Sequence, residues 1–228
     1  LPASLGEFHL LAGPYGQTPN AGVTPYRLNT PLFSDYAEKF RYFYVPPGKK
    51  IGWRDDGVLD FPVGSVLVKS FGYPIDMRAP AKGLRIFETR LLIRRTSGWI
   101  ALPYVWNADG SEATLRRAGM RINVSWIHLD GKPRAISYAI PNVNQCKGCH
   151  DDGAGGISLI GPKAHNLNRD GQLEAALRAG RIDRLPADIP RLPVWDDPAS
   201  ASVALRARAY LEANCAHCHN PKGPANTS

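Results

Sequence analysis

Between about residue 30 and residue 141, short runs of β-branched and aromatic residues alternate with turn residues. Six of these runs show the partial alternation of apolar and polar positions that is typical of strands. They cover residues 39–46, 65–71, 84–95, 98–106, 120–129 and 133–140. Because no long helical pattern separates them, they predict an antiparallel sheet with sandwich-like or barrel-like packing. Residues 111–118, which precede Gly119, predict one short helix within this region.

The pattern changes after Pro141. Apolar residues at helical spacing predict a helix at 172–179 and another at 203–214, the second capped by Ser200 or Ser202. A proline-rich connector at 185–198 has no regular pattern. The sequence therefore predicts an α+β protein, in which a β-rich, sandwich-like domain at 1–141 is followed by a mainly helical or irregular region.

All four cysteines belong to two copies of one motif. The copies are "CKGCH" (Cys146, Cys149, His150) and "CAHCH" (Cys215, Cys218, His219). Two thiols three positions apart can form thioethers with the two vinyl groups of a haem, and the histidine that follows can bind the iron. The motifs thus predict two covalently bound haem c groups, in which the cysteines are the anchors and the two histidines are the proximal iron ligands.

Two other uses of these cysteines are open. A structural zinc site usually has its two cysteine pairs about 15 to 20 residues apart, whereas 65 residues lie between Cys149 and Cys215. Zinc also does not explain both trailing histidines. Disulfides or a dithiol redox pair are the remaining alternative, but a thioredoxin-like pair needs a strand-to-helix setting that neither motif shows. Covalent haem is therefore the preferred interpretation.

The sixth ligand of each iron is less well indicated. His165 is a candidate because a loop of suitable length separates it from His150, although a polar loop histidine is the more common role. Met77 and Met120 are further candidates, but methionines in a β domain more often fill its core. His128 and His9 are weaker candidates. His217, inside the second motif, is expected at the solvated edge of its own haem.

The charge of the chain favours a protein partner. Its 28 basic and 20 acidic residues give a net charge of +8. The excess is scattered, and no nucleic-acid-binding motif accompanies it, so nucleic acid is not an expected partner. A basic surface can instead steer an acidic redox protein. No apolar run is long enough to span a bilayer, so no transmembrane segment is predicted.

Nearly the whole chain resembles a bacterial family of di-haem c-type cytochromes with a β-rich N-terminal region. The resemblance is carried by "YRLNTPLFSDYAEKFRYFYVPPG", "YAIPNVNQCKGCH" and "RARAYLEANCAHCHNPKGPA". Its C-terminal part is similar to a mono-haem cytochrome c domain, in which a helix ends in the haem motif. The resemblance implies a first haem segment and connector at 142–200 and the start of a second cytochrome c domain, incomplete here, at 201–228.

The resemblance also implies specific roles and a location. The carbonyl groups of Pro162 and Pro224 would accept the second ring N–H of His150 and His219, which orients each ligand. Because c-type haem is attached on the outer side of the cytoplasmic membrane, the resemblance implies a periplasmic protein.

We expect this chain to transfer single electrons between redox partners rather than to act as a catalyst. The alternative is a di-haem peroxidase or oxidase in which one haem is five-coordinate. A third hypothesis makes the β-rich region a binding module for a carbohydrate or a partner protein, but no group of residues points to a ligand.

Overall fold

A computed structural model of the chain describes residues 1–55, 57–151, 154–220, 223 and 225. Its centre is an antiparallel sheet in which each strand pairs with the next one along the chain, in the order β3-β4-β5-β6-β7-β8. The strands are β3 (Val23–Pro25), β4 (Glu38–Tyr44), β5 (Val66–Pro74), β6 (Leu84–Arg95), β7 (Gly98–Trp106) and β8 (Ala113–Leu115). The prediction of a β-rich, antiparallel N-terminal part is confirmed.

The last two predicted strands form a separate hairpin. β9 (Met120–Ile127) and β10 (Pro133–Ile140) pair with each other as a two-stranded sheet, and Ile127 adds an isolated bridge to Asp76, just after β5. Aromatic side chains attach the hairpin to the large sheet, because Tyr73 on β5 stacks on Trp126 with ring centroids 4.6 Å apart. The backbone N–H of Met77 also donates to the Ile127 carbonyl at 2.9 Å. The six predicted strands are thus divided between two sheets.

The predicted helix at 111–118 is wrong, since Ala113–Leu115 form strand β8. Hydrogen bonds in the preceding turn and pairing with β7 both favour an extended strand here. The Asn107 side-chain oxygen accepts from the backbone N–H groups of Ser111 and Glu112, at 3.0 and 3.2 Å. Residues 113–115 then pair antiparallel with β7. Pairing with a neighbouring strand outweighs the weak local helix propensity.

Helices are short and lie mostly after Pro141. They are α1 (Val143–His150), α2 (Ala164–Leu167), α3 (Gln172–Arg178) and α4 (Val203–Asn214), and α3 and α4 match their predicted positions. Before them come the 3-10 turns η1 (Leu5–Phe8), η2 (Pro14–Gly16) and η3 (Pro80–Lys82) and the small pair β1 (Leu11–Ala12) and β2 (Thr18–Pro19). Among the described residues no helix has the length and apolar character needed to cross a membrane.

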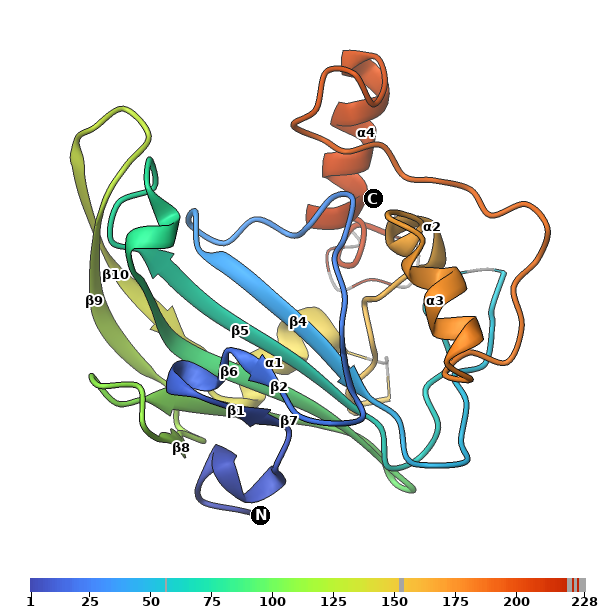
Figure 1. Cartoon of the computed structure of the whole chain (residues 1–228), viewed down its shortest axis with the longest axis horizontal. Coiled ribbons are helices and arrows are strands. Elements are labelled where there is room, and N and C mark those ends of the chain that lie inside the picture. Colours follow the sequence, from blue (N-terminus) through green and yellow to red (C-terminus); the bar gives the residue numbers. More distant parts are fainter. Residues whose placement is uncertain (56, 152–153, 221–222, 224, 226–228) are drawn as a thin grey trace.

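The two faces of the large sheet are covered by different parts of the chain (Figure 1). One face packs against the N-terminal segment, in a core that contains Leu5, Leu10, Val68, Leu91 and Tyr104. At one end of the other face, Phe43 and Leu67 share a core with side chains of the loop at 51–61 and of α2 and α3. At the opposite end of that face, Phe71 packs with the aromatic residues of the β9–β10 hairpin. Between these two apolar ends lies the candidate functional site.

Candidate functional site

Helix α1 presents the first motif. The chain enters it directly from β10, and Asn142 caps the first turn by accepting from the Gln145 backbone N–H at 2.7 Å. The Gln145 side chain accepts from the Asn142 N–H at 2.8 Å, which completes a capping box. Cys146 and Cys149 are one turn apart on this helix, so both thiols lie on the same side. Cys146 is half-buried and Cys149 is exposed.

The second motif begins where α4 ends, with Cys215 as the residue after the last helical turn. Polar contacts fix this end of the helix. The Asn214 side-chain oxygen accepts from the Phe33 backbone N–H at 2.7 Å, and Glu212 forms an ion pair with Lys163 at 3.3 Å. Cys215 and Cys218 are half-buried, and His219 is exposed.

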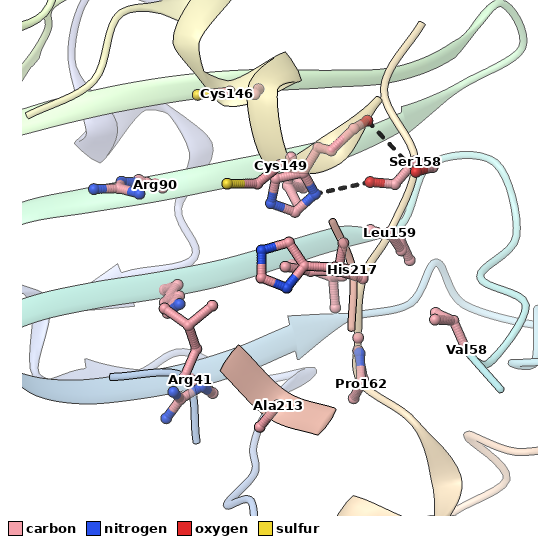
Figure 2. A pocket seen from close by; sticks show the side chains of 18 of the residues that line it. Arg41, Val58, Arg90, Cys146, Cys149, Ser158, Leu159, Pro162, Ala213 and His217 are labelled. Atoms are coloured by element: carbon pink, nitrogen blue, oxygen red, sulfur yellow. Dashed lines mark hydrogen bonds between the residues drawn. The ribbon is translucent and has the colours of Figure 1, made fainter. Parts of the chain in front are cut away.

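The two motifs meet at one cavity of about 1040 Å³. Its lining includes Cys146, Cys149 and His150 from the first motif and Ala216 and His217 from the second. The Sγ atoms of Cys149 and Cys218 and a ring nitrogen of His217 lie within 4.8 Å of one another. Figure 2 shows Cys149 and His217 side by side in the middle of the pocket. The cavity is at the upper end of the roughly 300–1,000 Å³ range of ligand pockets.

A hydrogen bond orients the first motif histidine. Nδ1 of His150 lies 2.8 Å from the Ser158 carbonyl oxygen. Since a carbonyl only accepts, Nδ1 carries the proton and Nε2 keeps its lone pair for a metal. Burial, as the largest effect, lowers the pKa of His150, which also favours the neutral ring.

The acceptor of this bond is not the one expected from the resemblance. The Pro162 carbonyl accepts instead from the Leu59 backbone N–H at 3.3 Å, although Pro162 does line the cavity. Ser158 takes its place because the loop after α1 folds back, with the Ser158 N–H donating to the His150 carbonyl at 2.6 Å. Pro224, the corresponding prediction for the second motif, lies outside the described residues.

Burial favours the protonated form of two of the four motif thiols. Burial raises the pKa of Cys146, and burial followed by the nearby Cys149 raises the pKa of Cys218. Burial, and then the charge of Lys163, lowers the pKa of His217. All four cysteines are free of disulfides. Burial therefore favours the neutral forms of Cys146, Cys218 and His217. Free thiols can attach to a cofactor or, once they lose their protons, bind a metal ion.

None of the five predicted distal candidates, the weaker His128 and His9 included, is among the residues that line the cavity in the described structure. Nε2 of His165 lies 2.7 Å from Oε1 of Glu212, so this side chain links α2 to α4. Met77 packs with the aromatic cluster of the β9–β10 hairpin. Met120 is 39% exposed at the start of β9. Their role as iron ligands stays a prediction that these positions do not favour.

Sequence reasoning missed several residues that do line the cavity. His217 was expected in solvent, yet it is half-buried beside Cys149. Arg41, Lys69 and Arg90 come from three strands and stand in the sequence only as part of a scattered charge. The two-residue alternation along these strands could have shown which basic side chains share a face, but only the strand register places them opposite one another.

Comparison of the chain with family models, with curated protein sequences and with solved structures gave no match.

Proposed function

We propose that this chain is a di-haem c-type cytochrome that passes single electrons between redox partners. The observation that carries the proposal is the meeting of the two Cys-x-x-Cys-His motifs, 65 residues apart in sequence, at one large cavity. Each motif has the thiol and imidazole spacing that covalent haem requires. Haem iron supplies one-electron chemistry by changing between its ferric and ferrous forms.

The residues of the cavity fit such a group. The thiols of Cys146 and Cys149 are free and lie on the same side of α1, and Nε2 of His150 is available as a ligand. The lining contains many aliphatic side chains that can exclude water, among them Leu28, Leu67, Leu92, Leu159 and Ile160. Convergence of the motifs would keep the two groups near each other, as electron transfer between them requires.

The proposal can be tested by producing the full chain in bacteria that carry out c-type maturation. Intact mass and pyridine-haemochrome spectra of the exported protein count the covalent haems. We expect two per chain, one in a variant with Cys146→Ser and Cys149→Ser, and one in a variant with Cys215→Ser and Cys218→Ser. Lys49→Met, which changes an exposed loop, serves as the control and should keep both haems. A wild-type protein without covalent haem would contradict the proposal.

A zinc site is the second candidate, because Cys149, His217 and Cys218 lie within 4.8 Å of one another. The large sequence separation of the cysteine pairs counts less against zinc once the fold brings the pairs together. Three such donors match the ligands of a tetrahedral zinc site. Metal analysis of the same preparations separates the two candidates. One zinc per chain without haem would favour the zinc site. Loss of that zinc in the variant His217→Ala would assign it to the cluster of Cys149, His217 and Cys218.

Location and partners follow from the same proposal. Covalent attachment of haem takes place outside the cytoplasmic membrane, so we propose that the chain functions in the periplasm. Its net charge of +8 favours acidic redox proteins as partners.

A further inference from the structure

Three basic side chains form a row across the sheet at the cavity. Arg41 on β4 is opposite Lys69 on β5, and Lys69 is opposite Arg90 on β6. Residues that are opposite each other in antiparallel strands point to the same face, and all three residues line the cavity. Neighbouring strands are about 4.8 Å apart, so the row extends over roughly 10 Å. We call these three residues the cationic row, and Figure 2 labels its two arginines.

Only one of the three basic side chains in the cationic row has a carboxylate partner in the described part of the chain. Arg90 forms a two-point ion pair with Glu88, at 2.6 and 2.9 Å. The Arg41 guanidinium donates to the Lys39 carbonyl at 3.3 Å, which supplies no full negative charge. Within the described parts of the chain, no carboxylate forms an ion pair with Arg41 or Lys69, and no hydrogen bond reaches Nζ of Lys69. The row therefore contains two basic side chains, Arg41 and Lys69, that have no carboxylate partner among the described residues.

This arrangement is unfavourable unless an anion binds to it. Like charges directly opposite each other on adjacent strands destabilise a sheet, and all three side chains are half-buried. Burial, followed by the charges of Arg41 and Arg90, holds the pKa of Lys69 well below its usual range. The Phe71 ring also holds the charged ends of Lys69 and Arg90 in place. Lys69 Nζ and Arg90 Cζ lie 4.9 and 4.4 Å from the centroid of this ring.

We propose that the cationic row binds the propionate carboxylates of the haem that Cys146 and Cys149 anchor, an inference that rests on the proposed function. The cavity combines a large apolar lining with two basic side chains that have no carboxylate partner among the described residues, and a haem combines a large apolar ring with two carboxylates at one edge. Arg41 offers a planar fork that can bind one carboxylate at two points, and Lys69 offers a compact charge for the other. A soluble dicarboxylate has the same charge, and the experiment below separates the two.

The experiment measures the affinity of the haem-free full chain for two ligands by spectroscopic titration. Mesohaem lacks vinyl groups and cannot form thioethers, and in its dimethyl ester both propionates are blocked. We expect wild type to bind mesohaem more tightly than the ester, on the order of tenfold or more. Lys69→Met and Arg41→Gln should each bring the ratio of the two affinities, mesohaem over its ester, closer to one. Lys49→Met, in an exposed loop, should leave this ratio unchanged.

Each variant is first checked by its thermal unfolding. Lys69→Met keeps a similar side-chain length and removes an unpaired, half-buried charge, so we expect no loss of stability. Equal affinity of wild type for the two ligands would overturn the inference. It would leave the proposed function intact, because that depends on the number of covalent haems.

Two other outcomes would also overturn it. If the ligands bind equally and succinate raises the unfolding temperature of wild type but not of Lys69→Met, the row serves a soluble dicarboxylate instead. Binding of neither ligand would show that the row and cavity of this chain do not receive a haem.

Discussion

Glu88 is a carboxylate with 0% of its surface exposed, and it depends on one basic side chain of the cationic row. Arg90, on the same strand, donates to both of its oxygens. A buried ion pair often adds little net stability, but removing one partner leaves a buried charge unpaired. The Glu88–Arg90 pair therefore anchors one end of the cationic row, and Arg41 and Lys69 are the members free to bind an anion.

We predict that Arg90→Met lowers the free energy of unfolding of the haem-free chain by about 3–5 kcal/mol, because Glu88 loses its counter-charge. Urea denaturation measures the change. The matched control is Arg134→Met, which breaks the exposed pair with Asp130 and should cost less than about 1 kcal/mol. If both variants lowered the free energy of unfolding by the same amount, this explanation of the role of Glu88 would be contradicted.

Lys39 makes stability depend on pH. Burial, followed by the charge of Arg41, lowers the pKa of Lys39 from 10.5 to about 8. Between these two values the unfolded chain binds the proton and the folded chain does not, so this residue makes stability rise as the pH increases. We predict that Lys39→Met is more stable than wild type at pH 7 and that this difference narrows by pH 9.5.

The measurement for Lys39 is urea denaturation of both proteins at the two pH values. Comparing the proteins at each pH cancels the other groups that titrate in this range. A difference that stays the same at both pH values would be evidence against the lowered pKa.

At the level of elements, the first motif is positioned by a close contact between the start of the β9–β10 hairpin and the start of α1. Gly119, just before β9, has a φ of +69°, and a Cβ atom there would lie 2.6 Å from the Ile140 carbonyl oxygen and 2.7 Å from the Asn142 nitrogen. Asn142 is the capping residue of α1. A glycine at this point lets the end of β10 and the first turn of α1 pack against the preceding turn.

We predict that Gly119→Ala destabilises the chain by more than the cost of the positive φ alone, which is about 1–3 kcal/mol, and reduces haem attachment at Cys146 and Cys149. The control is Gly48→Ala, because Gly48 has a φ of +73° and a Cβ atom added there would meet no described atom within 4 Å. Thermal unfolding and haem content of both variants measure the effect. If Gly48→Ala is as harmful as Gly119→Ala, the close contact is not the cause.

At the level of the whole molecule, the region after residue 141 completes the core of the β-rich part. Phe43 and Leu67 of the sheet share one apolar cluster with Leu167 of α2 and Leu173 of α3. The predicted domain boundary at 141 thus separates segments that pack together. This shared core keeps the sheet, with its cationic row, in place below the two motifs.

The net charge of +8 predicts how ionic strength affects electron transfer. Reduction of the haem-loaded protein by the ascorbate anion should slow as salt rises, because salt screens the attraction between opposite charges. Reduction by the hexaammineruthenium(II) cation should become faster, because the same salt screens repulsion. Stopped-flow rates at several salt concentrations test this, and the same salt dependence for both reductants would refute the idea of charge steering.

The sequence by itself determined the features that depend on neighbouring residues. The strands at 84–95, 98–106 and 133–140 and the helix at 203–214 agree with the structure because alternation, helical spacing and capping are local properties. The two haem-type motifs are equally local, since their spacing is that of the cofactor. The helix expected at 111–118 was wrong because the pairing of Ala113–Leu115 with β7 decided its conformation.

Only the tertiary structure decided how distant residues meet. Strand register places Arg41, Lys69 and Arg90 in one row, and a shift of one residue would turn a side chain to the other face. The fold brings Cys149 of α1 close to His217, just after α4, which no pattern within either motif indicates. The physical reason is the same in each case, because these contacts depend on how elements far apart in the chain pack and pair, and that arrangement leaves no local pattern in the sequence.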